Sequence, residues 1–508
     1  MTKVAVATTS QLAADGASQV AELGGNAVDC ALAAALFTMN TEPGVCALAG
    51  SAFITIWNPD SDPVTIDGNV AAPGKGLARG ELGHAADSVM LDYGGGIKTL
   101  CGPGSVAVPG SLAAIERAWT LFGNAEWKDL FGPTINATRD GFPLSSACHY
   151  YLGYSGRDIF DRSKDGFHAL HSADGKLHNP GDLIVIPHLA DTLAAIADEG
   201  ARVFYEGEIA ERITSHVRDA GGGLTMHDMR EFEAVERPSL TARIGEWTIA
   251  TNPPPAVGGA VLCAMLAACR DLPHDSWTRD ALARLIEVQR ATLAFRRQRL
   301  DLADDVGREA AELLELARND KLLSRWASAS TVHTSAVDDN GIACSITASS
   351  GYGSGEMPDG TGLWLNNCLG ELELNRRGLE AGPPGERLPS NMAPSIARRK
   401  GRVLAAGSPG ADRITTALHQ FLVNILQMEM TLKEAVAHPR LHIDMSGENE
   451  RLMAEPGLDL PEVDLPVHVM ESLNMYFGGI GATLADRKLG FRVESDPRRE
   501  GGTRICGE

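Results

Sequence analysis

Three side chains that carry a hydroxyl or an imidazole group occur at alternate positions in one short stretch. Thr331, His333 and Ser335 lie in a run of β-favouring residues, so a strand would place all three on one face. A similar run at 342–347 follows the turn sequence Asp338-Asp339-Asn340-Gly341, whose Asn-Gly pair is typical of a hairpin. A Thr hydroxyl becomes a good nucleophile only when a base lies nearby. Taken alone, the stretch predicts a β-hairpin followed by a Ser/Gly-rich loop.

A second stretch has the pattern of an anion-binding turn. Val403–Ala406 predicts a strand, residues 407–413 predict a turn, and Ile414–Leu426 predicts an amphipathic helix. A turn that leads into a helix presents free backbone N–H groups and the positive end of the helix dipole. The oxyanion that forms during acyl transfer needs such donors. The same pattern is also typical of an ordinary strand-to-helix turn.

Four motifs together resemble the gamma-glutamyltransferase family. They are Thr-x-His-x-Ser-x-Val-Asp at 331–338, Leu-Asn-Asn at 365–367, Gly-Gly-Asn-Ala-Val-Asp at 24–29 and the turn at 407–413. Members of that family are N-terminal-nucleophile hydrolases. The resemblance therefore implies an α+β protein, built as a four-layer αββα sandwich with two stacked antiparallel sheets. Helical runs that alternate with short strands independently favour a mixed α and β class.

The resemblance implies that the chain is made as one precursor that cuts itself between Ser330 and Thr331. Residues 1–330 would form the large subunit and 331–508 the small subunit, and the two would make one composite domain. The α-amino group freed by the cut has a pKa near 8, so it could take the proton of the Thr331 hydroxyl directly or through one water. The alternative is that Thr331 is an ordinary strand residue.

The resemblance also assigns groups around the nucleophile. Ser349 would support Thr331 with a hydrogen bond, and the backbone N–H groups of Gly410 and Ala411 would bind the oxyanion. Ala411 in place of a second glycine is compatible with this role, because only the backbone is used. Gly351 stands closest to an Asn that holds the substrate carboxyl end in the family.

Four further residues would hold the substrate. Glu371 falls where an acid binds the substrate α-ammonium, and a carboxylate suits an ammonium inside a closed site. Ser390 and Asn391 would donate hydrogen bonds to a substrate carboxylate, and Arg79 is the nearest candidate for the arginine that grips this group. Glu371 could instead be a solvated loop acid, and Arg79 a plain surface residue. Cys368 replaces a more polar residue that is common in the family.

The interval between Glu371 and Ser390 is shorter than in family members that carry a lid. Lids act by excluding water from the reacting groups. We therefore expect an open site, in which water competes well with amine acceptors for the acyl group.

Composition restricts the partners and the compartment. The 508-residue chain has a net charge of −21 and no run of Lys and Arg longer than three, so nucleic acid and anionic membrane are poor candidates. Nine cysteines without a Cys-x-x-Cys pair favour reduced thiols. With no secretion signal visible, we expect a cytoplasmic protein. No His/Glu pair has metal-binding helical spacing, so we predict no metal and no cofactor.

The remaining segments predict helices, strands and loops to which we assign no chemical role. Residues 11–23 and a segment from Ala27 predict two helices, with Gly24-Gly25 as the stop between them. Residues 53–57 and 64–67 predict paired strands, the Gly-rich interval 68–104 predicts loop, and 280–325 has a charged helical pattern.

The motifs together predict an enzyme that cleaves γ-glutamyl amides, such as glutathione-like molecules, and passes the acyl group to water or an amine. Its partners would be this small-molecule substrate and the two subunits of its own precursor. Two alternatives remain open. One is an amidase of the same scaffold with a glutaryl-type acyl group, which the residues at 351, 368 and 391 favour somewhat. The other is an uncleaved, non-catalytic binding protein.

Overall fold

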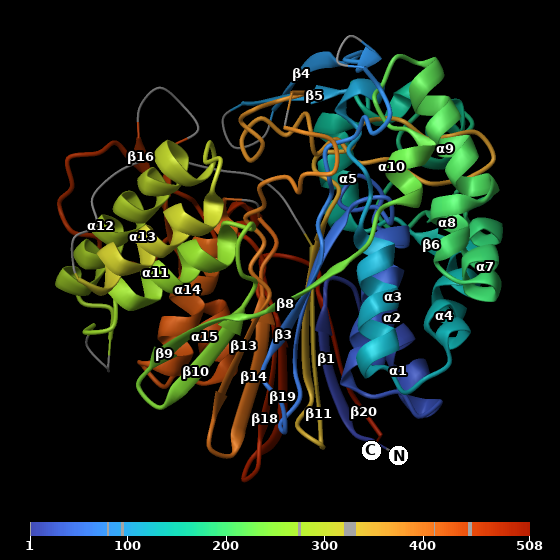
Figure 1. The fold of residues 1–508 in the computed structure, drawn as a ribbon. Helices are drawn as coiled ribbons and strands as arrows, with labels where there is room; N and C mark the ends of the chain where they lie inside the picture. Colours follow the sequence, from blue (N-terminus) through green and yellow to red (C-terminus); the bar gives the residue numbers. More distant parts are fainter. Residues whose placement is uncertain are drawn as a thin grey trace.

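Two β-sheets lie face to face in the centre of the molecule, and helices cover the outer face of each sheet (Figure 1). The computed structural model describes residues 2–78, 81–92, 96–272, 276–319, 332–380, 382–410, 412–445 and 450–507. The predicted αββα order of layers is confirmed.

The first sheet has seven strands, and each neighbouring pair in it is antiparallel. The predicted hairpin at 332–349 lies in its middle. In spatial order the strands are β20 (Gly502–Cys506), β1 (Val4–Thr8), β11 (Val332–Asp338), β12 (Ala343–Ser349), β2 (Ser51–Trp57), β3 (Val64–Gly68) and β8 (Val235–Pro238).

The second sheet has six strands and is also antiparallel throughout. In spatial order they are β19 (Gly490–Ser495), β18 (Gly481–Asp486), β14 (Arg402–Gly407), β13 (Ser395–Arg399), β10 (Trp247–Thr251) and β9 (Leu240–Ile244). Smaller sheets at the periphery are formed by β4 (Asp87–Leu91) with β5 (Ile97–Cys101), by β6 (Phe142–Pro143) with β7 (Leu183–Ile184), and by β15 (Leu441–Asp444), β16 (Arg451–Ala454) and β17 (Val467–Val469).

The helices divide into two groups, one for each sheet (Figure 1). On the side of the seven-stranded sheet are α1 (Gln11–Glu22), α2 (Ala27–Thr41), α3 (Ser111–Phe122), α4 (Trp127–Asp140), α5 (Ser146–Ser155), α6 (Lys164–Leu170), α7 (Leu189–Glu199), α8 (Arg202–Glu206), α9 (Glu208–Asp219) and α10 (Met226–Arg230). On the side of the six-stranded sheet are α11 (Gly258–Ala268), α12 (Arg279–Phe295), the π-helical turn η4 (Arg296–Leu300), α13 (Val306–Arg318), α14 (Arg413–Leu426) and α15 (Leu432–Ala437).

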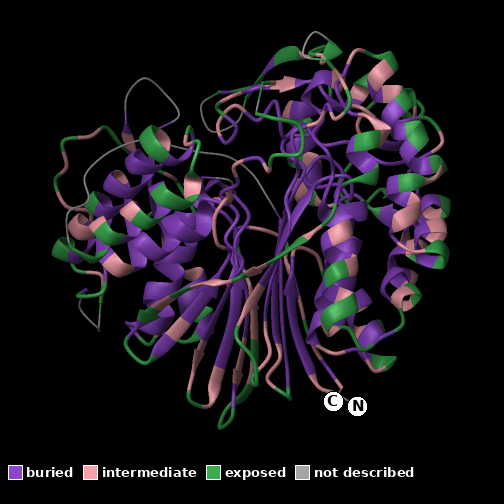
Figure 2. Cartoon of the chain, in the orientation of Figure 1, coloured by how far each residue is buried: buried purple, intermediate pink, exposed green. Residues whose placement is uncertain are grey.

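Most of the apolar core lies between each sheet and its own helices. One large cluster joins α2 to strands of the seven-stranded sheet, and a second joins α11 and α14 to the six-stranded sheet. Figure 2 shows both sheets buried over most of their length, whereas the outer helices expose stripes of their surface. The apolar cluster between the two sheets is much smaller.

One local prediction was wrong, and one predicted helix is more deeply buried than its sequence pattern indicates. The interval 68–104 is not all loop, because β4 and β5 pair as an antiparallel hairpin within it. The helix after residue 413 has no solvent face, because all fourteen residues of α14 are buried between the six-stranded sheet and its neighbouring helices. Tertiary packing overrides an amphipathic pattern when a helix is covered on both sides.

The layer between the sheets contains a buried histidine. His333 and Ser335 share one face of β11, as predicted, and His333 Nε2 lies 2.7 Å from Ser335 Oγ. His333 Nδ1 lies 3.0 Å from Thr347 Oγ1 on β12. Burial lowers the pKa of His333 to about 3, so the ring stays neutral.

The buried neutral histidine predicts acid lability. An unfolded histidine titrates near pH 6.5, whereas folded His333 has a pKa of about 3, so between these values the unfolded chain binds an extra proton. Its contribution to stability is complete above about pH 6.5 and is lost as the pH falls. We expect His333→Gln to reduce the fall in unfolding free energy between about pH 7.5 and 4.5 by roughly 2–3 kcal/mol.

Denaturant titrations of the two proteins at each pH measure this difference. His168→Gln, at an exposed position on α6, serves as the matched control and should leave the pH dependence as it is. An equal fall in the wild type and His333→Gln would contradict the prediction.

Candidate active site

A small cavity opens where the two sheets end, and it gathers three of the predicted site residues. Ser349, Glu371 and Ser390 all line it, although they come from distant parts of the chain. The complete lining is Ser51, Asn69, Val70, Ser349, Cys368, Glu371, Leu374, Leu388, Pro389, Ser390, Met392 and Ile414. The cavity therefore combines one acid, several small polar groups and an apolar wall.

Strand pairing sets the floor of the cavity. Ser349 is the last residue of β12 and pairs with Ser51, the first residue of β2, whose hydroxyl donates a hydrogen bond to the Ser349 carbonyl at 2.9 Å. β11 begins at Val332, which pairs with Ala348 beside them. Ser330 and Thr331, the predicted cleavage point and nucleophile, lie outside the described residues.

Glu371 is an unusual acid, because the residue is only 4% exposed and no Lys or Arg side chain is among the described residues that line the cavity with it. Its Oε1 accepts no hydrogen bond from the described part of the chain. Burial, and to a lesser degree the nearby Glu373 carboxylate, raise the pKa of Glu371 well above its usual value. A positive charge placed in the cavity would reverse that shift by favouring the ionised form.

The Asn366-Asn367 pair holds the wall of the cavity together. Asn366 is fully buried, and its Oδ1 accepts from the backbone N–H groups of Ala107 and Cys368 while its Nδ2 donates to the carbonyls of Ala49 and Ala107. The Asn367 Oδ1 accepts from Tyr352 N at 2.7 Å. Neither residue lines the cavity, so the pair positions Glu371 by fixing the loop that precedes it.

Ser390 and Asn391 differ in their access to the cavity. The Ser390 carbonyl accepts hydrogen bonds from Val257 N and Gly258 N where α11 begins, and its side chain faces the cavity. Asn391 is fully buried and packs against Gly258, and it is not among the residues that line the cavity. The expected pair of substrate donors is therefore represented in this cavity by Ser390.

The turn predicted to bind an oxyanion lies beside the cavity. Gly410 has a φ of +117°, in the region that favours glycine, and its carbonyl accepts from Arg413 N at 2.9 Å. A Cβ on Gly410 would lie 2.8 Å from Gly478 Cα, so a side chain has no room there. Ile414, in the first turn of α14, lines the cavity. Ala411 lies outside the described residues.

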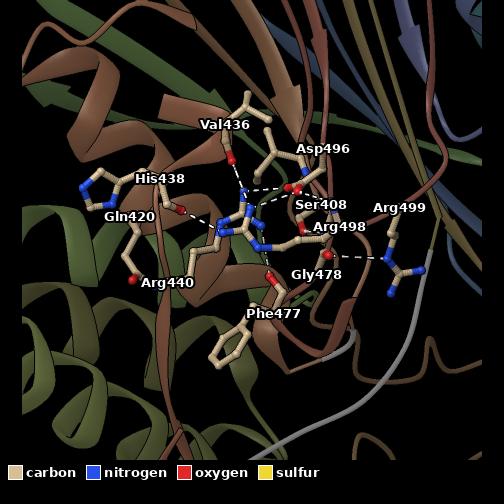
Figure 3. A network of polar contacts seen from close by, with 12 residues as sticks. Ser408, Gln420, Val436, His438, Arg440, Phe477, Gly478, Asp496, Arg498 and Arg499 are labelled. Carbon is tan, nitrogen blue, oxygen red and sulfur yellow. Dashed lines mark hydrogen bonds and ion pairs between the residues drawn. The ribbon is translucent and has the colours of Figure 1, made fainter. Parts of the chain in front are cut away.

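A buried polar network supports this turn from behind. Ser408 Oγ accepts a hydrogen bond from Gly479 N at 3.1 Å, and Asp496 Oδ2 accepts one from Ile480 N at 2.7 Å. Figure 3 shows the guanidinium groups of Arg440 and Arg498 converging on Asp496. Although burial alone would raise it, the pKa of Asp496 is lowered by these two arginines. The turn thus packs against a rigid, internally neutralised cluster.

Two polar cavity residues from the N-terminal half had not been predicted. Ser51 and Asn69 line the cavity, and Asn69 Nδ2 donates to the Leu388 carbonyl at 2.6 Å. Ser51 begins one short strand and Asn69 directly follows another, and these positions offered no chemical signal. Arg79 lies outside the described residues, and Leu77 nearby lines a different cavity of about 450 Å³.

The expectation of an open site was wrong for the described residues. Ser349, Glu371 and Ser390 are each less than a tenth exposed, because Leu374, Leu388 and Pro389 of the short covering segment close over the cavity. Residues 385–388 of this segment form three backbone hydrogen bonds with residues 70–72. Arg376 and Arg377 anchor it further by donating to the carbonyls of Arg297 and Ala303. A short segment can cover a site when it is tied down at several points.

No helix within the described ranges has both the length and the apolar character needed to cross a membrane. The described residues also contain no group of three or more His, Cys, Asp and Glu side chains arranged to hold a metal ion.

Comparison with solved structures defines the class of fold. The structure of cephalosporin acylase from Bacillus halodurans superposes with a TM-score of 0.81 at 21% identity, covering 100% of this chain and 96% of that one. Gamma-glutamyltranspeptidase from Helicobacter pylori gives a TM-score of 0.51 at 23% identity over 60% of this chain and 89% of that one. The chain has the αββα sandwich of the N-terminal-nucleophile hydrolases.

The sequence then defines the family. The model of the gamma-glutamyltranspeptidase family matches residues 13–506, and the chain belongs to this family. Glutathione hydrolase proenzyme from Pseudomonas sp. (strain A14) is 27% identical over 549 residues, covering 98% of this chain and 93% of the relative. Glutathione hydrolase proenzyme from Escherichia coli (strain K12) is 27% identical over 475 residues, covering 86% and 79%.

The bonding of Asn366 predicts a large effect of its removal. Asn366→Ala leaves up to four buried backbone groups without a partner, at a cost of about 1–3 kcal/mol each, so we expect a loss of roughly 4 kcal/mol or more in unfolding free energy. Denaturant unfolding measures the loss. Asn58→Ala, in a partly exposed turn, should change stability by less than about 0.5 kcal/mol. Similar losses in both variants would show that the Asn366 contacts matter little.

Proposed function

We propose that this protein is a self-processing γ-glutamyl hydrolase and transferase that acts on glutathione-like γ-glutamyl amides. The observation that carries the proposal is the buried Glu371 carboxylate, which shares one cavity with Ser349 and Ser390 and has no described cationic partner. A buried acid of this kind is costly unless a ligand compensates it. The α-ammonium of a γ-glutamyl group supplies that compensation.

Charge balance favours a γ-glutamyl group over a glutaryl group. Glu371 is the one charged side chain among the described residues that line the cavity, and burial keeps the Cys368 thiol neutral by raising its pKa. A γ-glutamyl group brings one ammonium and one carboxylate, so it adds no net charge. A glutaryl group would place a second carboxylate beside Glu371, and two acids that share a dry site raise each other's pKa. The Ser390 hydroxyl is a neutral donor for the γ-glutamyl carboxylate.

The nucleophile in this proposal is Thr331. It directly precedes Val332 in the sequence, and Val332 pairs with Ala348 at the floor of the cavity. After cleavage of the Ser330–Thr331 bond, the new α-amino group serves as the base for the Thr331 hydroxyl. Residues 1–330 and 331–508 would remain together as two subunits, because each of the two sheets contains paired strands from both parts.

The proposed reaction assigns each of these residues a step. The Thr331 oxygen attacks the γ-carbonyl carbon, and the negative charge that forms on the carbonyl oxygen meets the backbone N–H groups of Gly410 and Ala411. The amine leaves with a proton, and an ester to Thr331 remains. Water or a second amine attacks that ester and releases free glutamate or a new γ-glutamyl amide.

A cytoplasmic location forms part of the proposal. All nine cysteines are free thiols and all are buried. Reduced cysteines in this number suit a compartment that keeps thiols reduced.

Self-cleavage is the first test. We expect the purified protein to contain two chains, covering residues 1–330 and 331–508, because the mechanism needs a free amine on Thr331. Denaturing electrophoresis and intact-mass measurement detect them. Thr331→Ala should leave the precursor whole, whereas Thr334→Ala, at a buried strand threonine nearby, should not prevent the cut. An active preparation that contains only the full-length chain would disprove the mechanism.

The acyl donor is the second test. Glu371→Gln removes the charge that pairs with the ammonium and keeps the shape of the side chain. We therefore expect kcat/KM for γ-glutamyl anilides to fall about 30–150-fold, which corresponds to roughly 2–3 kcal/mol of transition-state binding. Activity on the matching glutaryl anilide, which lacks the ammonium, should stay the same or rise. Steady-state kinetics on both substrates measure the ratio.

Glu373→Gln is the matched control for this experiment. Glu373 lies two residues further on, accepts a hydrogen bond from Tyr352 Oη at 2.9 Å and does not line the cavity. Because the Glu373 charge only adds to the larger effect of burial on Glu371, its variant should change the ratio of the two substrates far less than Glu371→Gln does. If Glu371→Gln leaves the ratio unchanged, the glutaryl-type amidase becomes the better assignment.

A further inference from the structure

The 407–413 turn is attached to a second buried charge cluster, formed by Arg296, Asp301 and Asp412. Arg296 is the first residue of η4, and its side chain is fully buried. Its Nε donates to Asp301 Oδ1 at 2.9 Å, and its Nη1 donates to Asp412 Oδ1. One guanidinium therefore links the end of α12 to the residue that immediately precedes α14.

Asp412 does not cap the helix that it precedes. It is the N-cap residue of α14, but its side chain forms no capping hydrogen bond with that helix. An aspartate at this position ordinarily accepts from the first free N–H groups of the helix. Here its carboxylate is directed to Arg296, so those N–H groups are left for another acceptor.

The C-terminal end of the turn is thus held by two buried arginines. Arg296 holds Asp412, while Arg413 Nε donates to the Tyr476 carbonyl at 3.0 Å and its guanidinium lies 4.8 Å from the centre of the Tyr476 ring. Just before these anchors, Gly410 keeps a positive φ that few other residues adopt. Interactions in a site without water hold a geometry closely, because no solvent competes for the charged groups.

The π-helical form of η4 explains how Arg296 reaches the turn. A π-turn inserts an extra residue into the helix and redirects the side chains around it, and such turns are frequent at functional sites. Asp301, just after the turn, accepts a hydrogen bond from Arg296 Nε. The Nη1 group, on another edge of the guanidinium, is left to donate to Asp412.

We propose that Arg296 is a positioning residue for acyl transfer, which holds the backbone of the 407–413 turn in the geometry that binds the oxyanion. The proposal rests on the function proposed above. Arg296 does not line the cavity, so it would act only through Asp412. Its loss should weaken binding of the transition state and leave ground-state binding of the acyl group nearly unchanged.

The test compares Arg296→Met with Arg296→Lys. Removing one oxyanion donor outright typically costs about 100–1,000-fold in kcat, and a loosened turn should cost less, so we expect kcat of Arg296→Met to fall by about 10–100-fold with KM within about threefold of the wild type. Arg296→Lys keeps a positive charge but not the planar guanidinium, so its kcat should lie between those of the wild type and Arg296→Met. A boronic acid analogue of the acyl donor, whose tetrahedral adduct presents an oxygen to the turn, should lose affinity in parallel with kcat.

Asp301→Asn is the matched control. It alters the same cluster but leaves the contact between Arg296 and Asp412 in place. We expect it to lower the melting temperature and to leave kcat within about threefold, so a loss of stability can be separated from a loss of positioning. If Arg296→Met does not accumulate as folded protein, the same kinetic measurements on Arg296→Lys test the proposal.

The outcomes distinguish the two proposals. The positioning role would be overturned if the wild type turns over normally and the folded Arg296 variants keep an unchanged kcat. It would also be overturned if these variants show only a rise in KM. An equal fall of kcat in Asp301→Asn would also overturn it, because the cluster would then matter only for stability. A wild-type protein that cleaves no γ-glutamyl amide would contradict the proposed function, and this inference with it.

Discussion

The structure depends on how closely the two sheets approach at one end. β11 lies in the middle of the first sheet, and its His333 ring rests directly on Gly407, the last residue of β14 in the second. A Cβ at Gly407 would overlap the imidazole, so glycine is required for the sheets to meet. This contact brings the start of β11 beside the end of β14, where the 407–413 turn begins. The cavity and the turn therefore share one origin in the packing of the sheets.

That approach also explains why the site is assembled from distant segments. The central strands supply a rigid floor at Ser51 and Ser349, and the irregular segments on either side supply Glu371 and Ser390. Loops hold functional groups well when a rigid scaffold fixes their ends. Here the fixing is done by buried amides such as Asn366 and by the arginines of the covering segment. These polar contacts in the interior therefore fix the position of the site as well as stabilising the fold.

Sequence patterns predicted the features that depend on neighbouring residues. The hairpin at 332–349 followed from its Asn-Gly turn, and α2 begins at the Asn26 cap with Asp29 completing a capping box. Features set by distant contacts were missed. The complete burial of α14, the inclusion of Ser51 and Asn69 in the cavity, and the closed cover all depend on contacts with other elements that lie outside the local sequence pattern. The family resemblance located Glu371, but only the fold shows that it lies in a cavity with no cation beside it in the described chain.

The contrast among the buried acids separates structural groups from a binding group. Asp496 is neutralised by Arg440 and Arg498, and Asp412 by Arg296, so the fold pairs these acids internally. Breaking such a pair leaves a buried charge and is strongly destabilising, which keeps these acids fixed in place. Glu371 is as deeply buried, yet the described chain supplies it with neither a cation nor a donor for Oε1. Glu371 therefore differs from Asp412 and Asp496 in having no cation from the described chain beside its carboxylate, which suits the ammonium group of the proposed substrate.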